Sequence, residues 1–518
     1  MGKTGTDEAV TEYDVIVIGS GIGGLTAAGL LARAGKAVLV LESHDRPGGY
    51  AHGFKRKKYR FDAGVHLISG CGPAGYRGGQ IIHKVLRALE VDKEIRFIPV
   101  DPFSHAYYPG FDAALPQTIE AFVAQLGQRF PEERRGLEEL TRLCLQVAQE
   151  ITVADEMIAE LDHERALQLL PALFEYRKAT LAEVASKFIK EPKLLALFAS
   201  NWPYLGLPPS QVSFVYWSTM LIGYMVDGAY YCQGGFQQLA DTLVHGFRKH
   251  GGEIRFRAKA EKILVEDGRV FGVVAGGQRL SAPVVISNAD IRHTVCEMVG
   301  EQHFPPRYIR RIKKMRHSLS IFVVYIATDL DLAAMNLAHE SFCYRAVDHD
   351  HNFARTAAGD ITWLSITAPT LIDPELAPPG QHLLMLTTLL PYQAAETWKQ
   401  AKAGYMSKML EIAEHYVPGL QQHILFIEGG SPATMRRYTQ NYQGAAYGWD
   451  VSPDQVGPAR ISNQSPLKGL YFAGHWTSPG GGVYGVSVSG VQAAQKVIGI
   501  RKQGEFWREL QENEEAPS

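Results

Sequence analysis

Two glycine-rich stretches, one near each end of the chain, have the residue types and spacing of a phosphate- or cofactor-binding turn. The first, GSGIGG at positions 19–24, follows the β-branched run Val15–Ile18 and leads into an Ala/Leu-rich segment that we expect to be helical. Gly19 permits the tight turn, Gly21 lets the backbone approach a pyrophosphate, and Gly24 allows the helix to pack closely on the strand. The N-terminus of the helix attracts the anion.

The elements around this first turn decide how it is interpreted. A second apolar run, Ala37 to Leu41, follows the expected helix and ends at Glu42. Glu42 stands at the distance expected for a carboxylate that accepts hydrogen bonds from a ribose hydroxyl. Strand, turn, helix, strand and acid in this order predict a dinucleotide-binding unit. A purely structural turn is the alternative.

The second glycine-rich stretch lies close to the C-terminus. A strand-like run, Leu470 to Ala473, leads through Gly474 into the loop PGGGV at positions 479–483, and a small-residue helix is expected to begin near Gly485. The positive end of such a helix stabilises negative charge on a bound group. A surface glycine loop is the alternative.

Composition limits the classes of protein to which the chain can belong. Its 518 residues, 46% hydrophobic and 20% charged, predict a folded protein with two or more domains. A net charge of −2 gives no electrostatic reason to expect a nucleic-acid partner. The five cysteines form no CxxC pair, which favours a reducing compartment without a disulfide framework, zinc site or other metal.

The ends of the chain carry no evident targeting signal. The polar start, residues 1–14, lacks the basic and apolar regions of a signal peptide and is expected to be a disordered lead-in. Residues 503–518 are expected to fade into an acidic tail. No transmembrane helix is evident, so a cytoplasmic location is expected, with association with a membrane surface left open.

A third glycine-containing stretch, in the middle of the chain, also stands before an expected helix. Positions 231–236, YCQGGF, open a helical segment that ends near His250. The segment beyond it is apolar, and Asp267-Gly268 and Gly276-Gly277 divide it with tight turns. We therefore expect a three-stranded meander followed by a core strand, Val284 to Ile286.

The loop after Glu42 identifies a family resemblance. Arg46-Pro-Gly48-Gly49 and the turn FDAG at positions 61–64 resemble the flavin amine-oxidase and phytoene-desaturase group, which places R-x-G-G and F-D-x-G at these points. The resemblance implies one tightly bound, noncovalent FAD. An extended FAD is too long for one βαβ unit, so the second glycine-rich stretch would hold its flavin end. The cofactor-binding residues so implied are Gly19, Gly21, Ile22, Gly23, Gly24, Glu42, Ser43, Arg46, Gly48, Gly49, Gly64, Val65, His66, Ala260, Gly474, His475, Gly482, Val483, Gly485 and Val486.

The resemblance also implies the architecture. It predicts an α/β protein with a Rossmann-type (GR2-like) FAD-binding domain assembled from three segments, 12–95, 227–292 and 429–502. An inserted α+β substrate domain would come from residues 96–226 and 293–428, and residues 503–518 would be a tail.

Other stretches resemble carotenoid isomerases, phytoene desaturases and retinol saturases more than amine oxidases. They are residues 373–382, residues 437–449 and the turn Gly64-Val65-His66, which resembles the retinol-saturase version. The resemblance implies an FAD-dependent enzyme that desaturates, saturates or isomerises C=C bonds of a long hydrophobic isoprenoid, with an unknown electron donor or acceptor. An amine oxidase and a flavin-retaining binding protein without turnover are the alternatives.

Two side chains are candidates for catalysis. The resemblance places His66 beside the flavin, where it could donate a proton or stabilise charge. A histidine that is hydrogen-bonded to backbone is an equal alternative. Tyr484 lies inside the second glycine-rich stretch, with packing as its other role, and His475 would contact the ribityl chain or cap its loop.

A charge-free stretch bears on the substrate. Residues 194–226 contain no charged side chain, and the part after Pro209 is too short to span a bilayer. Buried core is one interpretation. The other is the wall of a hydrophobic tunnel, or a patch resting on a membrane, through which a polyene would enter.

Overall fold

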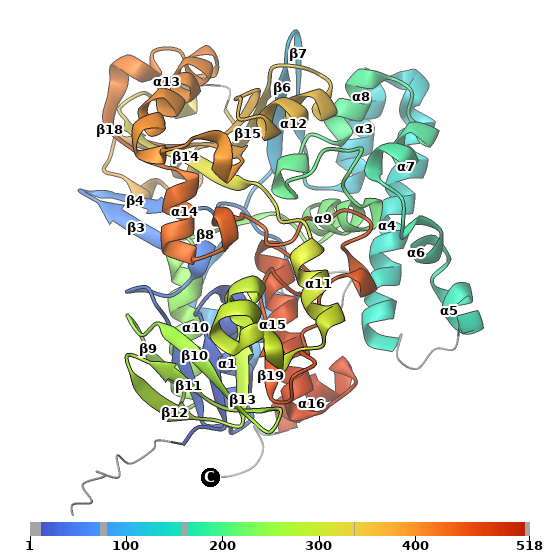
Figure 1. Cartoon of the computed structure of the whole chain (residues 1–518). Coiled ribbons are helices and arrows are strands. Elements are labelled where there is room, and N and C mark those ends of the chain that lie inside the picture. The colour runs from blue at the N-terminus through green and yellow to red at the C-terminus, as the bar shows by residue number, and fades with distance from the viewer. Residues whose placement is uncertain (1–11, 73–79, 158–162, 336, 513–518) are drawn as a thin grey trace, which may run out of the picture.

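The chain folds around two large sheets, of five and seven strands, and the described residues also form three smaller sheets (Figure 1). The computed structural model describes residues 12–72, 80–157, 163–335 and 337–512. Residues 13–41, 237–287 and 470–512 lie together in the lower half of Figure 1, and most of residues 97–226 and 320–430 form the upper half.

The lower half contains a five-stranded parallel sheet with the strand order β19-β13-β1-β2-β9. Every residue of the two central strands β1 and β2 is buried, as expected for a parallel sheet covered on both faces. The sheet draws strands from all three segments predicted to form the FAD-binding domain, and the predicted fold class is confirmed. The strands are β1 (Val15–Ile18), β2 (Val38–Leu41), β9 (Glu253–Arg255), β13 (Val284–Ser287) and β19 (Leu470–Phe472).

Helices α1 (Ile22–Arg33), α10 (Gln237–Lys249) and α15 (Gly482–Ile498) pack together beside this sheet. A Cβ atom at Gly490 in α15 would lie 2.4 Å from the carbonyl oxygen of Gly23 in α1, so these two helices approach so closely that only glycine fits. Helix α15 begins three residues before the expected Gly485, because the chain already turns helical at the end of the glycine loop.

The predicted meander is confirmed as strands β10 (Ala260–Glu266), β11 (Arg269–Ala275) and β12 (Gln278–Ser281), which pair antiparallel in that order. All four residues of its two turns have positive φ angles, including Asp267 at 47°. Asp-Gly and Gly-Gly pairs suit such hairpin turns because they tolerate this conformation.

The upper half contains a seven-stranded sheet with the order β18-β14-β17-β16-β15-β6-β7. All its pairs are antiparallel except β15 with β6. Helix α13 (Trp398–Tyr416) packs its apolar side on this sheet. The strands are β6 (Ser104–Tyr108), β7 (Phe111–Leu115), β14 (Ser320–Thr328), β15 (Glu340–Tyr344), β16 (Trp363–Thr367), β17 (His382–Leu390) and β18 (Ile424–Gly430).

A helical layer stands beside this sheet, on the right of Figure 1. Its longest helix, α4 (Arg134–Met157), packs against α9 (Phe214–Val226). The other members are α3 (Ile119–Arg129), α5 (His163–Leu169), α6 (Pro171–Tyr176), α7 (Leu181–Phe188) and α8 (Pro192–Phe198). The remaining helices and strands are α2 (Ile81–Ala88), α11 (Pro306–Lys314), α12 (His349–Ala357), α14 (Pro432–Thr439), β3 (Gly53–Arg56), β4 (Tyr59–Asp62), β5 (Phe97–Pro99) and β8 (Tyr230–Cys232).

The charge-free stretch 194–226 belongs to the core. Trp217 and Leu221 are 0% and 1% exposed, and within the stretch Ser210 and Gln211 are exposed. The interpretation of this stretch as a patch resting on a membrane is therefore wrong, since its large apolar side chains face protein. Across the described residues, no helix combines the length and the apolar character needed to cross a membrane.

Two expectations about the chain ends also need correction. Residues 503–512 form a helix, α16 (Gln503–Glu512), in place of a tail, because Phe506 and Leu510 share one helical face that is buried in the core. At the other end, Tyr13 of the expected lead-in is buried and donates a hydrogen bond to Glu253 (2.6 Å). Residues 1–11 and 513–518 lie outside the described residues.

Candidate active site

A pocket opens at the carboxyl ends of β1, β2, β13 and β19. Open parallel sheets bind ligands at this edge, because the loops and helix N-termini that follow the strands converge there. Most residues predicted to bind the cofactor line this one pocket. They are Gly19, Gly21, Ile22, Gly23, Glu42, Ser43, Gly48, Gly49, Gly64, Val65, Ala260, Gly474, His475, Gly482, Val483 and Val486.

The first glycine-rich turn is too crowded for side chains. Gly19 has a φ of 94°, and a Cβ atom at Gly24 would lie 2.2 Å from the Gly19 carbonyl oxygen. A Cβ atom at Gly23 would lie 2.9 Å from the backbone nitrogen of Gly474. The two glycine-rich stretches, predicted to serve one ligand, are therefore in direct contact.

Two helices present their N-termini to the pocket. Ile22 begins α1, Gly482 begins α15, and both residues line the pocket. The N-cap positions are Gly21 and Gly481, and neither supplies a side chain to the first backbone N–H groups. Unsatisfied N–H groups at helix starts attract anions.

Glu42 ends β2 and is only 8% exposed. One carboxylate oxygen accepts from the backbone nitrogen (2.7 Å) and the hydroxyl (2.6 Å) of Ser20, and the other accepts from the backbone nitrogen of His44 (2.7 Å). The carboxylate thus ties the first glycine turn to the loop after β2 while it lines the pocket.

Asn288 is a pocket residue that sequence reasoning missed. It follows β13, and a Cβ atom at Gly21 would lie 2.7 Å from its Nδ2 atom. The same side chain lies 2.5 Å, through its Oδ1 atom, from where a Cβ atom of Gly474 would be. Its position one residue after a strand of the parallel sheet is the same signal that identified Glu42.

Other lining residues that the sequence did not reveal come from loops distant in the chain. Tyr50 donates its hydroxyl proton to the carbonyl of Ala445 (2.9 Å), and Tyr447 donates to that of Pro203 (2.8 Å). Lys259, Asp290 and Thr439 also line the pocket.

Five predicted site residues lie outside the lining of this pocket: Gly24, Arg46, His66, Tyr484 and Gly485. Arg46 donates to the carbonyl of Gly53 (3.0 Å) and to Asp45, so it braces the loop that carries Gly48 and Gly49. Tyr484 packs its ring on Gly70, where a Cβ atom would lie 2.6 Å from Cδ2. This contact fits the packing role that was the alternative to catalysis for Tyr484.

His66 follows the lining residues Gly64 and Val65, and its side chain is 12% exposed. Its Nδ1 atom lies 3.2 Å from the carbonyl oxygen of Gly64, and its Nε2 atom lies 3.0 Å from a carboxylate oxygen of Glu340. Burial, the largest single influence, would lower the pKa of His66, but Glu340, Gly64 and Asp62 together raise that pKa above its usual value.

Asp62, the acid of the F-D-x-G turn, has a structural role. One of its oxygens accepts from the backbone nitrogen of Phe236 (2.7 Å) and the other from the hydroxyl of Tyr231 (2.7 Å). Burial raises the pKa of Asp62 to about 6, against these hydrogen bonds. The carboxyl group of Asp62 therefore links residues 12–95 to residues 227–292, the first two segments predicted to bind FAD.

His475 has the opposite character to His66. Burial, followed by repulsion from Arg460, lowers the pKa of His475 to about 3, so its ring is neutral near pH 7. Its carbonyl oxygen accepts a hydrogen bond from Arg460 (2.7 Å).

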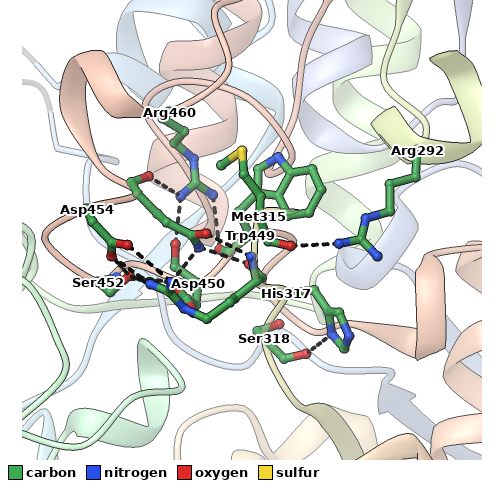
Figure 2. Close-up of polar contacts among 11 residues, drawn as sticks. Arg292, Met315, His317, Ser318, Trp449, Asp450, Ser452, Asp454 and Arg460 are labelled. Atoms are coloured by element: carbon green, nitrogen blue, oxygen red, sulfur yellow. Dashed lines mark hydrogen bonds and ion pairs between the residues drawn. The ribbon is translucent and has the colours of Figure 1, made fainter. Parts of the chain in front are cut away.

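Arg460 holds the loop that carries His475, and Figure 2 shows its guanidinium beside Trp449 and Asp450. Its guanidinium is 3% exposed and donates to backbone carbonyls on both sides of the loop, including those of Thr477 (3.0 Å), Trp449 (3.2 Å) and Asp450 (3.1 Å). Nearby, Arg316 pairs with Asp450 and Asp454, so a polar network supports this wall of the pocket from behind.

Replacing Arg460 by methionine should destabilise the protein and loosen its flavin. Several buried carbonyls would lose their donor, at about 1–3 kcal/mol for each unpaired group. We expect a fall of about 3 kcal/mol or more in the free energy of unfolding, measured with urea. Arg501→Met, which changes an exposed arginine beyond α15, is the control. Unchanged stability of the Arg460 variant would contradict this structural role.

The comparisons with known proteins agree with this geometry. A model of the family "Flavin containing amine oxidoreductase" matches residues 22–498. The chain belongs to this family. The predicted FAD cofactor and the predicted class of FAD-dependent oxidoreductase are confirmed.

Its relatives within the family include enzymes with narrower names. Prolycopene isomerase 1 (chloroplastic) of an Oncidium hybrid cultivar is 29% identical, with 96% of this chain and 86% of the relative covered. All-trans-retinol 13,14-reductase of Danio rerio is 27% identical (89% and 82% covered). Phytoene desaturase (lycopene-forming) of a Paracoccus species is 28% identical (93% and 97% covered).

Solved structures support the fold. An oxidoreductase from Methanosarcina mazei superposes with a TM-score of 0.63 at 19% identity, covering 94% of this chain and all of that one. Cyclohexylamine oxidase from Brevibacterium oxydans gives 0.59 at 15% identity (96% and 99% covered). The recognised resemblance to this group is thus confirmed.

Proposed function

We propose that this flavoenzyme acts on carbon–carbon double bonds of a long hydrophobic polyene, such as a carotenoid or retinoid. The observation that carries the proposal is the similarity to an isomerase, a reductase and a desaturase of such molecules, over more than four-fifths of each relative's length. The reaction is desaturation, saturation or cis–trans isomerisation.

The pocket fits an extended FAD. The glycines Gly21 and Gly23 bring backbone to the pocket wall, and two helix N-termini supply positive ends for anionic groups. We propose that the first glycine turn and Glu42 hold the dinucleotide end and that Gly474, Gly482 and Val483 hold the flavin end. Bound FAD supplies hydride transfer, which the protein orients and shields from water.

The chain's own candidate for charge control is His66. It lies one residue beyond the pocket lining, and its raised pKa favours the protonated ring near neutral pH. We propose that its positive charge stabilises negative charge that develops nearby during the reaction. Tyr484 supports the fold of its loop by packing.

Anaerobic incubation of the oxidised and the reduced holoprotein with phytoene, prolycopene and all-trans-retinol tests the proposal. Turnover by the oxidised form indicates desaturation, and stoichiometric consumption of reductant indicates saturation. Activity of the reduced form without net consumption indicates isomerisation. Putrescine and cyclohexylamine are included because the family name favours an amine oxidase as the second candidate. Turnover of an amine alone, or of none of these compounds, would overturn the proposal.

We also propose that the protein approaches its hydrophobic substrate at an anionic membrane surface, through the hairpin β3–β4. Lys55, Lys57, Lys58 and Arg60 are exposed on this hairpin, and Lys55 stands directly opposite Arg60 in the register. Like charges placed opposite each other destabilise a hairpin. Among the described residues, no carboxylate lies within ion-pair distance of these four side chains, whereas Arg56 pairs with Glu428. The hairpin therefore offers uncompensated positive charge.

Replacing Lys57 and Lys58 by glutamine should weaken binding to vesicles containing phosphatidylserine. Each basic residue near such a surface contributes about 1 kcal/mol, so two should account for about a 30-fold loss in partitioning. Sedimentation with vesicles at low salt measures this effect, and vesicles of phosphatidylcholine alone are the control. Equal partitioning of the variant and the parent protein would refute a role for the hairpin.

A further inference from the structure

Glu340 is a fully buried carboxylate that the proposed function does not yet use. It begins β15, in the region predicted as the second part of the substrate domain, and is 0% exposed. One of its oxygens accepts from the hydroxyl of Thr367 on the neighbouring strand (2.7 Å) and lies 3.0 Å from Nε2 of His66. A buried carboxylate is costly unless a positive charge and hydrogen bonds compensate it.

The ring of His66 has an acceptor at each nitrogen. Nδ1 lies 3.2 Å from a carbonyl oxygen, that of Gly64, and Nε2 faces the carboxylate of Glu340. A neutral imidazole carries one N–H donor, whereas the protonated ring carries two. The contact with Glu340 lies off the line of an ideal hydrogen bond, so charge attraction dominates it. This attraction requires the protonated ring.

The other titratable groups around His66 agree with this charge. Asp62 adds a weaker attraction that also raises the pKa of His66. His339, whose Nε2 atom donates to the carbonyl oxygen of His66 (2.8 Å), has a pKa lowered to about 4 by burial and is neutral near pH 7. The ring of Tyr204 lies 6.1 Å from that of His66, and burial raises its pKa well above its usual value. Glu340 is thus the dominant charge facing His66.

The pair is mutual. Burial alone would raise the pKa of Glu340, but His66, followed by Thr367 and His339, lowers it below its usual value. Each member therefore favours the ionised form of the other, whereas burial alone would favour the neutral form of both.

We infer that Glu340 is a positioning residue that holds His66 as a fixed imidazolium cation, with the Nδ1–H group directed at the Gly64 carbonyl and the Glu340 carboxylate beside Nε2. This inference rests on the proposed role of His66 and decides between the two roles considered for it. With Nδ1 held by Gly64 and the charge of the ring paired with Glu340, His66 supplies a fixed positive charge, and it does not supply a proton to the substrate.

The state of the ring can be measured without any substrate. In holoprotein labelled with ¹⁵N-histidine, the His66 signals are assigned by their absence in His66→Ala. At pH 6.5 the parent protein should show His66 with both nitrogens protonated. A neutral tautomer at this pH would overturn the inference, and this result does not depend on the folding of a Glu340 variant.

Glu340→Gln keeps the shape of the side chain and an acceptor for Thr367 but removes the charge. It should lower the pKa of His66 by about 1–3, because an opposite charge at this distance is worth that much. Glu340→Asp should retain most of the raised pKa, and Glu428→Gln, at an exposed carboxylate paired with Arg56, should leave it unchanged. An unchanged titration of His66 in Glu340→Gln would also overturn the inference.

The turnover assays separate this inference from the proposed function. If His66 titrates as expected but no polyene is turned over, the ion pair stands and the proposed substrate class fails. If a polyene is turned over, the activity of Glu340→Gln should decline at a lower pH than that of the parent protein, because the imidazolium form is lost earlier. Identical pH profiles would contradict the positioning role.

Discussion

A Gly21→Val variant should fold and purify with little or no flavin. The added Cβ atom would lie 2.7 Å from Nδ2 of Asn288, and the valine methyl groups would extend into the pocket that both residues line. Overpacking of this kind costs about 1–3 kcal/mol, which corresponds to about 5- to 150-fold weaker binding. The ratio of flavin absorbance near 450 nm to protein absorbance, roughly tenfold lower in the variant, measures the effect.

Gly404→Val is the matched control, because a Cβ atom at this exposed glycine of α13 meets no atom within 4 Å. It should retain its full complement of flavin. A yellow, fully loaded Gly21→Val protein would refute the assignment of the first glycine turn to the cofactor. Denaturation should release the flavin from the parent protein, since the attachment is predicted to be noncovalent.

A His66→Ala variant should keep its FAD and lose most of its turnover. The side chain lies outside the pocket lining, so its removal spares the cofactor contacts but deletes the positive charge proposed to assist the reaction. The loss should approach the factor of about 10²–10³ that is typical when a group that stabilises developing charge is removed. Rates with the substrate found in the panel, together with flavin content, measure both effects.

His423→Ala is the matched control for this variant. His423 also pairs with a carboxylate, that of Asp329 at 2.8 Å, but both side chains are about half exposed at the surface. Its turnover should equal that of the parent protein. A normal rate in His66→Ala with full flavin would remove His66 from the mechanism, and joint loss of flavin and folding would favour a structural role.

Local patterns predicted the FAD-binding frame well. The run Val15–Ile18, the glycine turn and the strand that ends before Glu42 follow one another in the sequence. The dinucleotide-binding unit could therefore be identified from one continuous stretch. The meander was equally readable because Asp267-Gly268 and Gly276-Gly277 tolerate the positive φ angles of its turns. The domain boundaries stay predictions.

Features that depend on distant contacts were not predicted. Glu340 faces His66 only because β15 enters the second sheet beside β6 and β16, and nothing near Glu340 in the sequence indicates a charged partner. The sequence left the location of the apolar stretch 194–226 undecided between core and membrane surface, because an apolar side chain such as Trp217 suits either place. The helix α16 was missed because its charged residues outnumber the few apolar ones that anchor it.

The order of the strands in the parallel sheet also limits how the protein can fold while it is being synthesised. Strand β1 pairs with β13, and β13 pairs with β19, near the end of the chain. Contacts between residues so far apart in sequence form slowly, and the edges of the strands stay unpaired until those contacts form. The nascent chain cannot complete its sheet, or bring its second glycine stretch against the first, until β19 and the residues after it have been synthesised. Completion of the sheet and completion of the cofactor pocket therefore both depend on one event, the pairing of β19 with β13.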